Sequence, residues 1–211
     1  VLVLLCLLSL SLLLTGACGA FLVWRSYAAY KGVVQKELPM LAALRDVSKQ
    51  GTLSRRALSG FAGAQNETQR QRKVDDFEAT VRNNDRNMMV FKELMNGKDE
   101  GDLYTQLEKS RSNYIKAARD FIKSFNRLDK IEIRERRDEL ESLYGNYIDD
   151  KDDLADYTEA LCATKSLQII EKGKALYYFF LIVALWPIFI SLVFFSYAIL
   201  TTGFALFRAR K

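Results

Sequence analysis

Two long runs without a charged side chain, separated by a charged middle segment, constrain this chain more than any other feature. Residues 1–24 and 175–207 contain no Asp, Glu, Lys or Arg. A helix of about 20 apolar residues is long enough to cross the hydrocarbon core of a bilayer. The intervening residues 25–174 are rich in charge and could not enter that core. The sequence therefore predicts two transmembrane helices that flank a water-exposed domain.

The basic residues after the second run predict how the chain is oriented in the membrane. Arg208, Arg210 and Lys211 follow directly on the second apolar run. Basic residues close to a span favour the cytoplasmic side. We therefore expect residues 208–211 to form a cytoplasmic tail, and two spans place both termini in the cytoplasm. The middle segment would be periplasmic or extracellular, and the chain would lie in the inner (plasma) membrane in contact with lipid.

The first run has a second interpretation as a cleaved signal peptide. The stretch from Leu14 to Cys18 resembles a lipoprotein cleavage site. It contains one residue too many between Leu14 and Cys18 for that pattern. We therefore favour an uncleaved span.

Composition and missing motifs exclude several function classes. The net charge is +5, and the three basic residues of the tail leave the middle segment without a strongly basic surface for nucleic acid. The chain has no histidine, the commonest general base and metal ligand. It also lacks a phosphate-binding glycine loop, a dinucleotide turn, a cysteine pair at zinc spacing and a nucleophile elbow. We expect no enzyme activity, no catalytic residue, no metal site and no cofactor.

The middle segment has the periodicity of an all-α domain. Its apolar residues recur at helical spacing, and Pro39 is its one proline. Glycine and asparagine mark breaks at residues 59–66 and 96–101, and a weaker break lies near Asp129. These breaks predict four helices, at about residues 25–62, 67–95, 101–128 and 131–174.

Heptad rows within these four segments predict an antiparallel up-down-up-down four-helix bundle. In the third segment one row consists of Leu107, Tyr114, Phe121 and Leu128, and the other consists of Leu103, Ser110, Ala117 and Ser124. In the fourth segment one row consists of Ile133, Leu140, Tyr147, Leu154 and Leu161, and it lies beside Leu143 and Tyr157. In the second segment the rows are Val74, Val81, Met88 and Met95, with Phe77, Asn84 and Phe91 between them. No Gly-Pro linker separates the outer helices from the apolar runs, so we expect them to continue into the spans.

Three polar residues interrupt the predicted seams. Asn84 and Asp150 occupy core heptad positions, and Arg45 follows Leu38 on a row of the first helix, beside the row of Val34 and Leu41. We expect Arg45 and Asp150 to pair inside the bundle, with Asn84 in an adjacent layer, because a buried charge needs a partner. Such a layer either sets the register of the helices or contributes to a ligand or signalling site.

Three further features keep two interpretations each. Cys162 stands alone in the middle segment, as an inert thiol or as a contact across a dimer. The acidic residues between Asp149 and Asp156 form a solvated helix face or hold a hard cation, although they lack calcium-loop spacing. Asn66 begins a glycosylation sequon and is also a suitable helix cap.

Two stretches carry a resemblance to a known family. Residues 38–44 (Leu-Pro-Met-Leu-Ala-Ala-Leu) and 108–114 (Glu-Lys-Ser-Arg-Ser-Asn-Tyr) are similar to bacterial methyl-accepting chemotaxis receptors. The order of span, four-helix bundle and span also resembles the four-helix-bundle sensor domain of that family. The resemblance covers nearly the whole chain.

This resemblance implies a sensory receptor. It implies a homodimer that detects a small molecule or a periplasmic protein. The signal would pass through the membrane as a small piston movement of one end helix. Arg55 and Arg56 lie about where the arginines of aspartate-type receptors bind ligand. In the family a signal-relay domain follows the second span, so coding sequence beyond Lys211 would favour a receptor. A stand-alone bundle would instead favour an accessory or structural subunit of a larger membrane complex.

Overall fold

A computed structural model describes residues 2–209 and is helical along nearly its whole length, in agreement with the predicted all-α class. Val1, Arg210 and Lys211, with the outermost ends of the predicted first span and basic tail, lie outside the described residues. The elements are α1 (Leu2–Gly32), a π-helical turn (Val33–Glu37), α2 (Leu38–Ala62), α3 (Glu67–Leu94), α4 (Lys98–Ser124), a 3-10 turn (Phe125–Arg127) and α5 (Lys130–Ala209).

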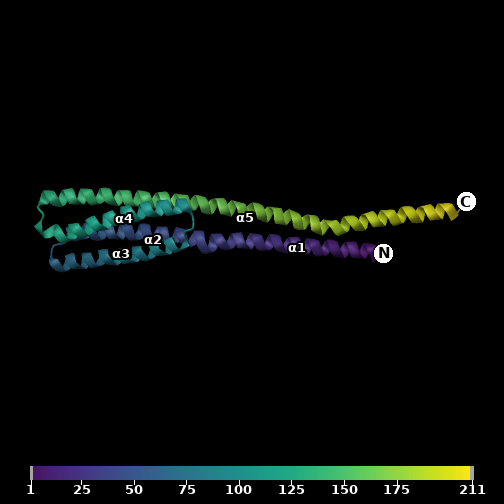
Figure 1. Cartoon of the computed structure of the whole chain (residues 1–211), viewed down its shortest axis with the longest axis horizontal. Coiled ribbons are helices and arrows are strands. Elements are labelled where there is room, and N and C mark those ends of the chain that lie inside the picture. The colour runs from purple at the N-terminus through teal and green to yellow at the C-terminus, as the bar shows by residue number, and fades with distance from the viewer. Residues whose placement is uncertain (1, 210–211) are drawn as a thin grey trace. The chain divides into compact units, whose positions relative to one another are not determined.

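The chain divides into two compact units, and the one formed by residues 31–165 is a four-helix bundle. In this unit α2, α3, α4 and the first part of α5 lie side by side (Figure 1). The α2–α3 and α4–α5 connections lie at one end of the bundle, and the α3–α4 connection lies at the other. The up-down-up-down order follows from these short connections.

The second unit consists of residues 1–30 and 166–211, from α1 and the last part of α5. The two helices approach closely at Gly19, where an added Cβ would lie 3.3 Å from the ring of Phe180. Among the described residues, none of the helices combines the length and the apolar character that a membrane crossing requires.

Side-chain caps explain where two bundle helices begin. The Oδ1 atom of Asn66 accepts a hydrogen bond from the backbone N–H of Gln69 (2.9 Å), so Asn66 caps α3. The Glu100 carboxylate accepts hydrogen bonds from the backbone N–H groups of Asn96 (3.1 Å) and Gly97 (3.0 Å). With this second cap α4 begins at Lys98, three residues before the start that the sequence predicted for this helix.

A π-helical turn precedes α2 and was not anticipated. The N–H of Leu38 donates to the carbonyl of Val33, five residues back. Pro39 follows directly; it has no N–H, and its ring clashes with the carbonyl four residues earlier in a regular helix. The wider π turn lies directly before this proline, where a regular helix would have the conflict.

The buried core follows heptad rows, and in three helices one or both rows differ from the sequence assignment. The rows of α3 agree, whereas α2 buries the two interleaved rows Val33, Met40, Val47, Ser54, Phe61 and Glu37, Leu44, Gly51, Leu58. The second rows are Tyr104, Arg111, Ala118 and Phe125 in α4, and Tyr144, Lys151 and Thr158 in α5. Three of the four corrected rows contain a charged residue, namely Glu37, Arg111 or Lys151. A search for apolar repeats therefore moves to the neighbouring residue and misses the row by one position.

Candidate functional site

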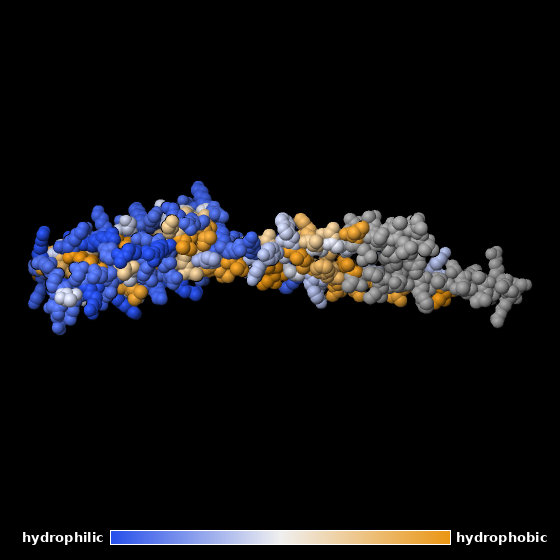
Figure 2. Space-filling model, turned by 90° about the horizontal axis from the view of Figure 1, so that it is seen from below, coloured by the Kyte–Doolittle hydropathy of each residue, from blue (hydrophilic) through white to orange (hydrophobic). Residues whose placement is uncertain are grey.

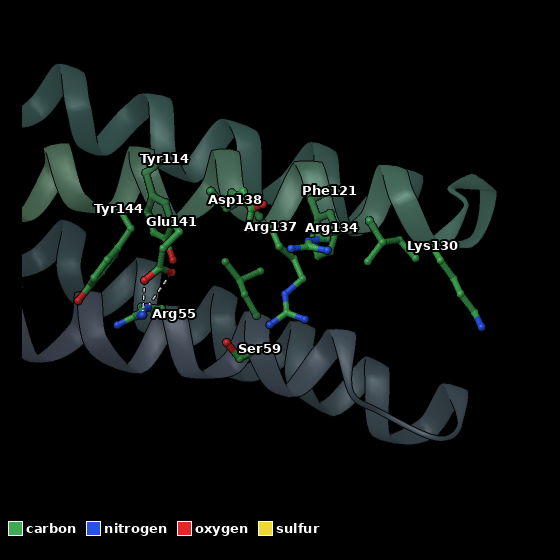
Figure 3. A pocket seen from close by; sticks show the side chains of 13 residues that line it. Arg55, Ser59, Tyr114, Phe121, Lys130, Arg134, Arg137, Asp138, Glu141 and Tyr144 are labelled. Atoms are coloured by element: carbon green, nitrogen blue, oxygen red, sulfur yellow. Dashed lines mark hydrogen bonds and ion pairs between the residues drawn. The ribbon is translucent and has the colours of Figure 1, made fainter.

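A cleft of about 590 Å³ lies between α2 and α5 on the bundle. Arg55, Leu58 and Ser59 line it from α2, and Tyr114 and Phe121 line it from α4. The α5 side is strongly charged and consists of Lys130, Ile133, Arg134, Arg137, Asp138, Leu140, Glu141 and Tyr144. Figure 3 shows Arg55 and Ser59 on one helix facing this charged stretch of the other.

The cleft is open because one of the two core rows of α5 consists of charged residues in the first turns of the helix. Positions 130, 137 and 144 continue the core row of residues 151 and 158 at seven-residue intervals. Lys130 and Arg137 occupy the first two of these positions, and both side chains are exposed. All six residues from 134 to 139 are exposed as well. Long charged side chains keep their heads in water, so this part of α5 cannot close on α2.

Arg55 and Glu141 form a bridge across the cleft. The Nε atom of Arg55 donates to Oε2 of Glu141 at 2.9 Å, and its Nη2 atom pairs with the other carboxylate oxygen. The guanidinium also lies over the ring of Tyr144, with its central carbon 5.2 Å from the ring centroid. Two-point pairing and stacking are contacts that arginine makes and lysine does not. They hold the Arg55 head at a defined place in the wall (Figure 3).

Three further cations in the lining have no such partner. Within the described part of the chain, Lys130, Arg134 and Arg137 take part in none of the ion pairs. The lining thus contains four basic side chains and two acidic ones, Asp138 and Glu141. Because Glu141 already pairs with Arg55, the unpaired charge in the cleft is predominantly positive. Such a surface attracts anions.

The inner side of the cleft is aromatic. The rings of Tyr114 and Tyr144 meet edge to face, with their centroids 5.6 Å apart. The hydroxyl oxygens of Tyr114 and Ser54 are 3.3 Å apart and can share a hydrogen bond. Burial raises the pKa of Tyr114 well above its ordinary value, so this hydroxyl stays protonated. The side chains therefore combine a neutral, apolar inner wall with a charged outer wall.

The structure separates the two arginines that the family resemblance singled out. Arg55 lines the cleft, whereas Arg56 is exposed and is not part of the lining. Adjacent residues on a helix point about 100° apart, so one of two neighbours can line a pocket that the other does not reach. The cleft residues of α5 were missed by the sequence analysis. The seven-residue spacing of Lys130, Arg137, Tyr144 and Lys151 was the signal that could have indicated them.

The predicted polar layer needs correction. Asn84 is buried, and its Nδ2 atom donates to the hydroxyl of Tyr147 (2.8 Å) and to the carbonyl of Val47 (3.4 Å). Arg45, however, is exposed, and Asp150 is half-buried and accepts a hydrogen bond from Gln106. The predicted buried Arg45–Asp150 pair is therefore wrong. The one-residue error in the α2 register placed Arg45 on the inner face.

The acidic residues near Asp150 do not gather around a common point. Asp149, Asp152, Asp153 and Asp156 are exposed on α5. Among the described residues, no three His, Cys, Asp or Glu side chains are close enough together to hold a metal ion. The exposure of the four aspartates agrees with the solvated-face interpretation.

Comparisons with known proteins agree with the geometry. A family model described as a four helix bundle sensory module for signal transduction matches residues 1–170. A solved structure, described as the periplasmic sensor domain of a sensor histidine kinase, is similar over 62% of this chain and 88% of its own, with a TM-score of 0.55. At 17% identity this likeness supports the fold alone. No curated protein matches the chain.

Proposed function

The chain belongs to the family of four-helix-bundle sensory modules for signal transduction, and from this premise we propose that it is the ligand-detecting part of a transmembrane receptor. The resemblance to the sensor domain of chemotaxis receptors is thereby confirmed at the level of the module. The observation that carries the proposal is the basic cleft between α2 and α5. We give this cleft a binding role and no catalytic one, because its charges can hold an anion and the chain contains no histidine.

The ligand class that suits the cleft is a small molecule with two or more carboxylate or phosphate groups. Ligand pockets for small molecules are typically about 300–1,000 Å³, and the cleft lies within this range at about 590 Å³. Arg134 and Arg137 present unpaired guanidinium groups, which recognise carboxylate and phosphate oxygens in a two-point geometry. Tyr114 and Tyr144 add apolar surface for a carbon skeleton.

Calorimetric titration of the full chain in detergent, with a panel of di- and tricarboxylates and phosphate esters, tests this proposal. For any ligand that binds, Arg137→Gln should raise the dissociation constant about tenfold or more, because a charge-assisted hydrogen bond is lost. Arg56→Gln is the matched control, since it removes an exposed arginine on α2 that is not part of the cleft. Equal effects of the two substitutions, or no binding by any member of the panel, would contradict the proposal.

We also propose that α1 and the last part of α5 each cross the membrane. Large apolar side chains are exposed on both helices, and water would be an unfavourable environment for them. They include Phe21, Val23 and Trp24 on α1, and Ile182, Leu185, Trp186, Phe189 and Leu192 on α5. Together with the uncharged runs 1–24 and 175–207, this supports two spans with cytoplasmic termini. The bundle would then be periplasmic, as the description of the similar sensor domain states for that protein.

The remaining expectations concern partners. The family resemblance supports a homodimer, which cross-linking of the full chain in its native membrane would reveal. Stable copurification with a multi-subunit membrane complex, combined with no binding in the titrations, would instead favour the accessory-subunit alternative.

A further inference from the structure

A small cavity lies in the interior of the bundle, separate from the cleft. Residues of α2, α3, α4 and α5 line it, among them Gln50, Ser54, Asn84, Arg111, Tyr114 and Tyr147. Its volume is about 10 Å³, which is close to the minimum that one water molecule requires. Besides Val81 and Ile115, the residues of this lining carry side-chain polar atoms.

Three buried polar atoms in this lining have no hydrogen-bond partner among the described residues. They are Oε1 of Gln50, Oδ1 of Asn84 and Nε of Arg111. Asn84 is 5% exposed and Arg111 is 9% exposed, so bulk water does not reach the orphaned atoms. A buried polar group without a partner typically costs about 1–3 kcal/mol, and three around one cavity require a common explanation.

The chemistry of these three atoms identifies their partner. Nε–H of Arg111 is a donor, whereas the amide oxygens of Gln50 and Asn84 are acceptors. The orientation of the Asn84 amide is set by its Nδ2 atom, which donates to the carbonyl of Val47, a group that can only accept. A cation would be repelled by Arg111, and an anion would find two acceptors. A water molecule can accept one hydrogen bond and donate two.

We propose that the cavity binds one structural water molecule that joins three helices. The water accepts a hydrogen bond from Nε–H of Arg111 on α4. It donates one hydrogen bond to Oδ1 of Asn84 on α3 and one to Oε1 of Gln50 on α2. Tyr147 of α5 enters the same network through its hydrogen bond with Asn84. All four helices of the bundle are thereby tied to one buried polar layer.

The site is close to solvent on one side, which gives the water a route of entry. Val81, Arg111 and Ile115 line both the cavity and an open groove between α3 and α4. Tyr114 lines both the cavity and the basic cleft. The water site does not depend on the proposed function, because its evidence lies within the core.

X-ray radiolytic labelling of the full chain in detergent tests the water site. Hydroxyl radicals formed from a bound water oxidise the side chains beside it, even where bulk solvent is excluded. Tyr147 and Tyr114 are only 1% and 2% accessible to solvent, and both should nevertheless be labelled during the X-ray irradiation. Phe77 and Phe91, which have no exposed surface and do not line the cavity, are the control and should stay unlabelled. If the two tyrosines are labelled no more than these phenylalanines, the proposal is overturned.

A pair of variants tests whether Gln50 holds the water. Gln50→Leu removes an acceptor at similar volume, and the labelling of Tyr147 should be lost. Gln50→Glu keeps an acceptor, and the labelling should persist. Unchanged labelling in Gln50→Leu would overturn the assignment of Gln50 oxygen as a ligand of the water. The comparison of Tyr147 with Phe77 in the unmodified chain decides the proposal even if Gln50→Leu does not fold.

Discussion

Two glutamates are buried inside the bundle, each beside a lysine. Glu37 has no exposed surface, and its carboxylate accepts a hydrogen bond from Lys165 on α5. Glu100 is 1% exposed, caps α4, and lies 3.8 Å from the ammonium of Lys36. Removing charges from water is costly, and only pairing and hydrogen bonding offset that cost. These pairs therefore make each partner strongly dependent on the other.

Replacing one member of the Glu37–Lys165 pair should destabilise the bundle more than replacing both. Lys165→Met leaves the Glu37 carboxylate buried without its partner, and we expect a loss of about 3 kcal/mol in the free energy of unfolding. This is the low end of the usual range, because Lys165 is partly exposed. Chemical denaturation of Lys165→Met, of Glu37→Met and of the variant that carries both substitutions measures the coupling energy between the two residues.

The double variant should recover most of that stability, since two apolar residues replace the pair. Arg136→Met is the control, because its pair with Glu139 is exposed and should contribute less than about 1 kcal/mol. Additive single effects, with no coupling energy, would show that Glu37 and Lys165 do not interact.

Tyr147 should make the bundle sensitive to alkaline pH. Burial raises the pKa of its hydroxyl to about 12, whereas a tyrosine in an unfolded chain ionises near pH 10. Because the folded pKa is the higher one, the stabilisation is complete below about pH 10 and is lost as the pH rises toward 12. Denaturation at several pH values should show a flatter decline for Tyr147→Phe than for the unmodified chain.

At the scale of elements, α2 is placed by a close approach to α5. An added Cβ on Gly51 would lie 2.9 Å from a ring carbon of Tyr147. That ring is held by hydrogen bonds of its hydroxyl with Asn84 and with the carbonyl of Val47. The ring cannot move without breaking these bonds, so glycine at position 51 is what allows the two helices to meet. At the start of the same helix, the π turn lies directly before Pro39.

Two glycine substitutions distinguish this contact from helix propensity. Gly51→Ala should lower the free energy of unfolding by about 1–3 kcal/mol, because the added methyl group overpacks the core. Gly145→Ala is the matched control on α5, where no atom lies within 4 Å of the added Cβ. It should stabilise the chain by up to about 1 kcal/mol through helix propensity alone. Thermal melts of both variants measure the difference, and a stabilising Gly51→Ala would contradict the α2–α5 contact.

At the scale of the whole molecule, the two units have opposite surface character. Figure 2 shows hydrophilic side chains over most of the visible face of the bundle. On α1 and the last part of α5, by contrast, many of the described side chains are large, apolar and exposed. A bundle in water and an apolar unit in lipid would satisfy both surfaces, as the proposed topology requires.

Cysteine labelling tests that topology. Cys162 lies on α5 within the bundle and is partly exposed. After Cys6 and Cys18 are replaced by alanine, a membrane-impermeant maleimide added to intact cells should label Cys162. In a chain whose single cysteine is introduced by Arg208→Cys, labelling should require permeabilised cells. The reverse pattern would place the bundle in the cytoplasm and contradict the proposed orientation.

The sequence alone determined the helical class, the breaks between helices and the antiparallel order of the bundle. These properties depend on local features: helical spacing of apolar residues, and Gly, Asn and Asp at the breaks. The rows of α3 were also predictable, because Phe77, Val81, Met88 and Phe91 are apolar and buried. Only the neutral Asn84 interrupts them.

The tertiary structure alone decided the register of α2 and the existence of the cleft. Glu37 faces the core because Lys165, 128 residues away, supplies its partner, and no local pattern contains that information. Arg55 lines a cleft because Arg137 and its neighbours keep the first turns of α5 away from α2. A buried or exposed charge looks the same in a heptad pattern. Whether a charged side chain is buried depends on which side chains of the other helices lie beside it, and this is a property of the folded bundle.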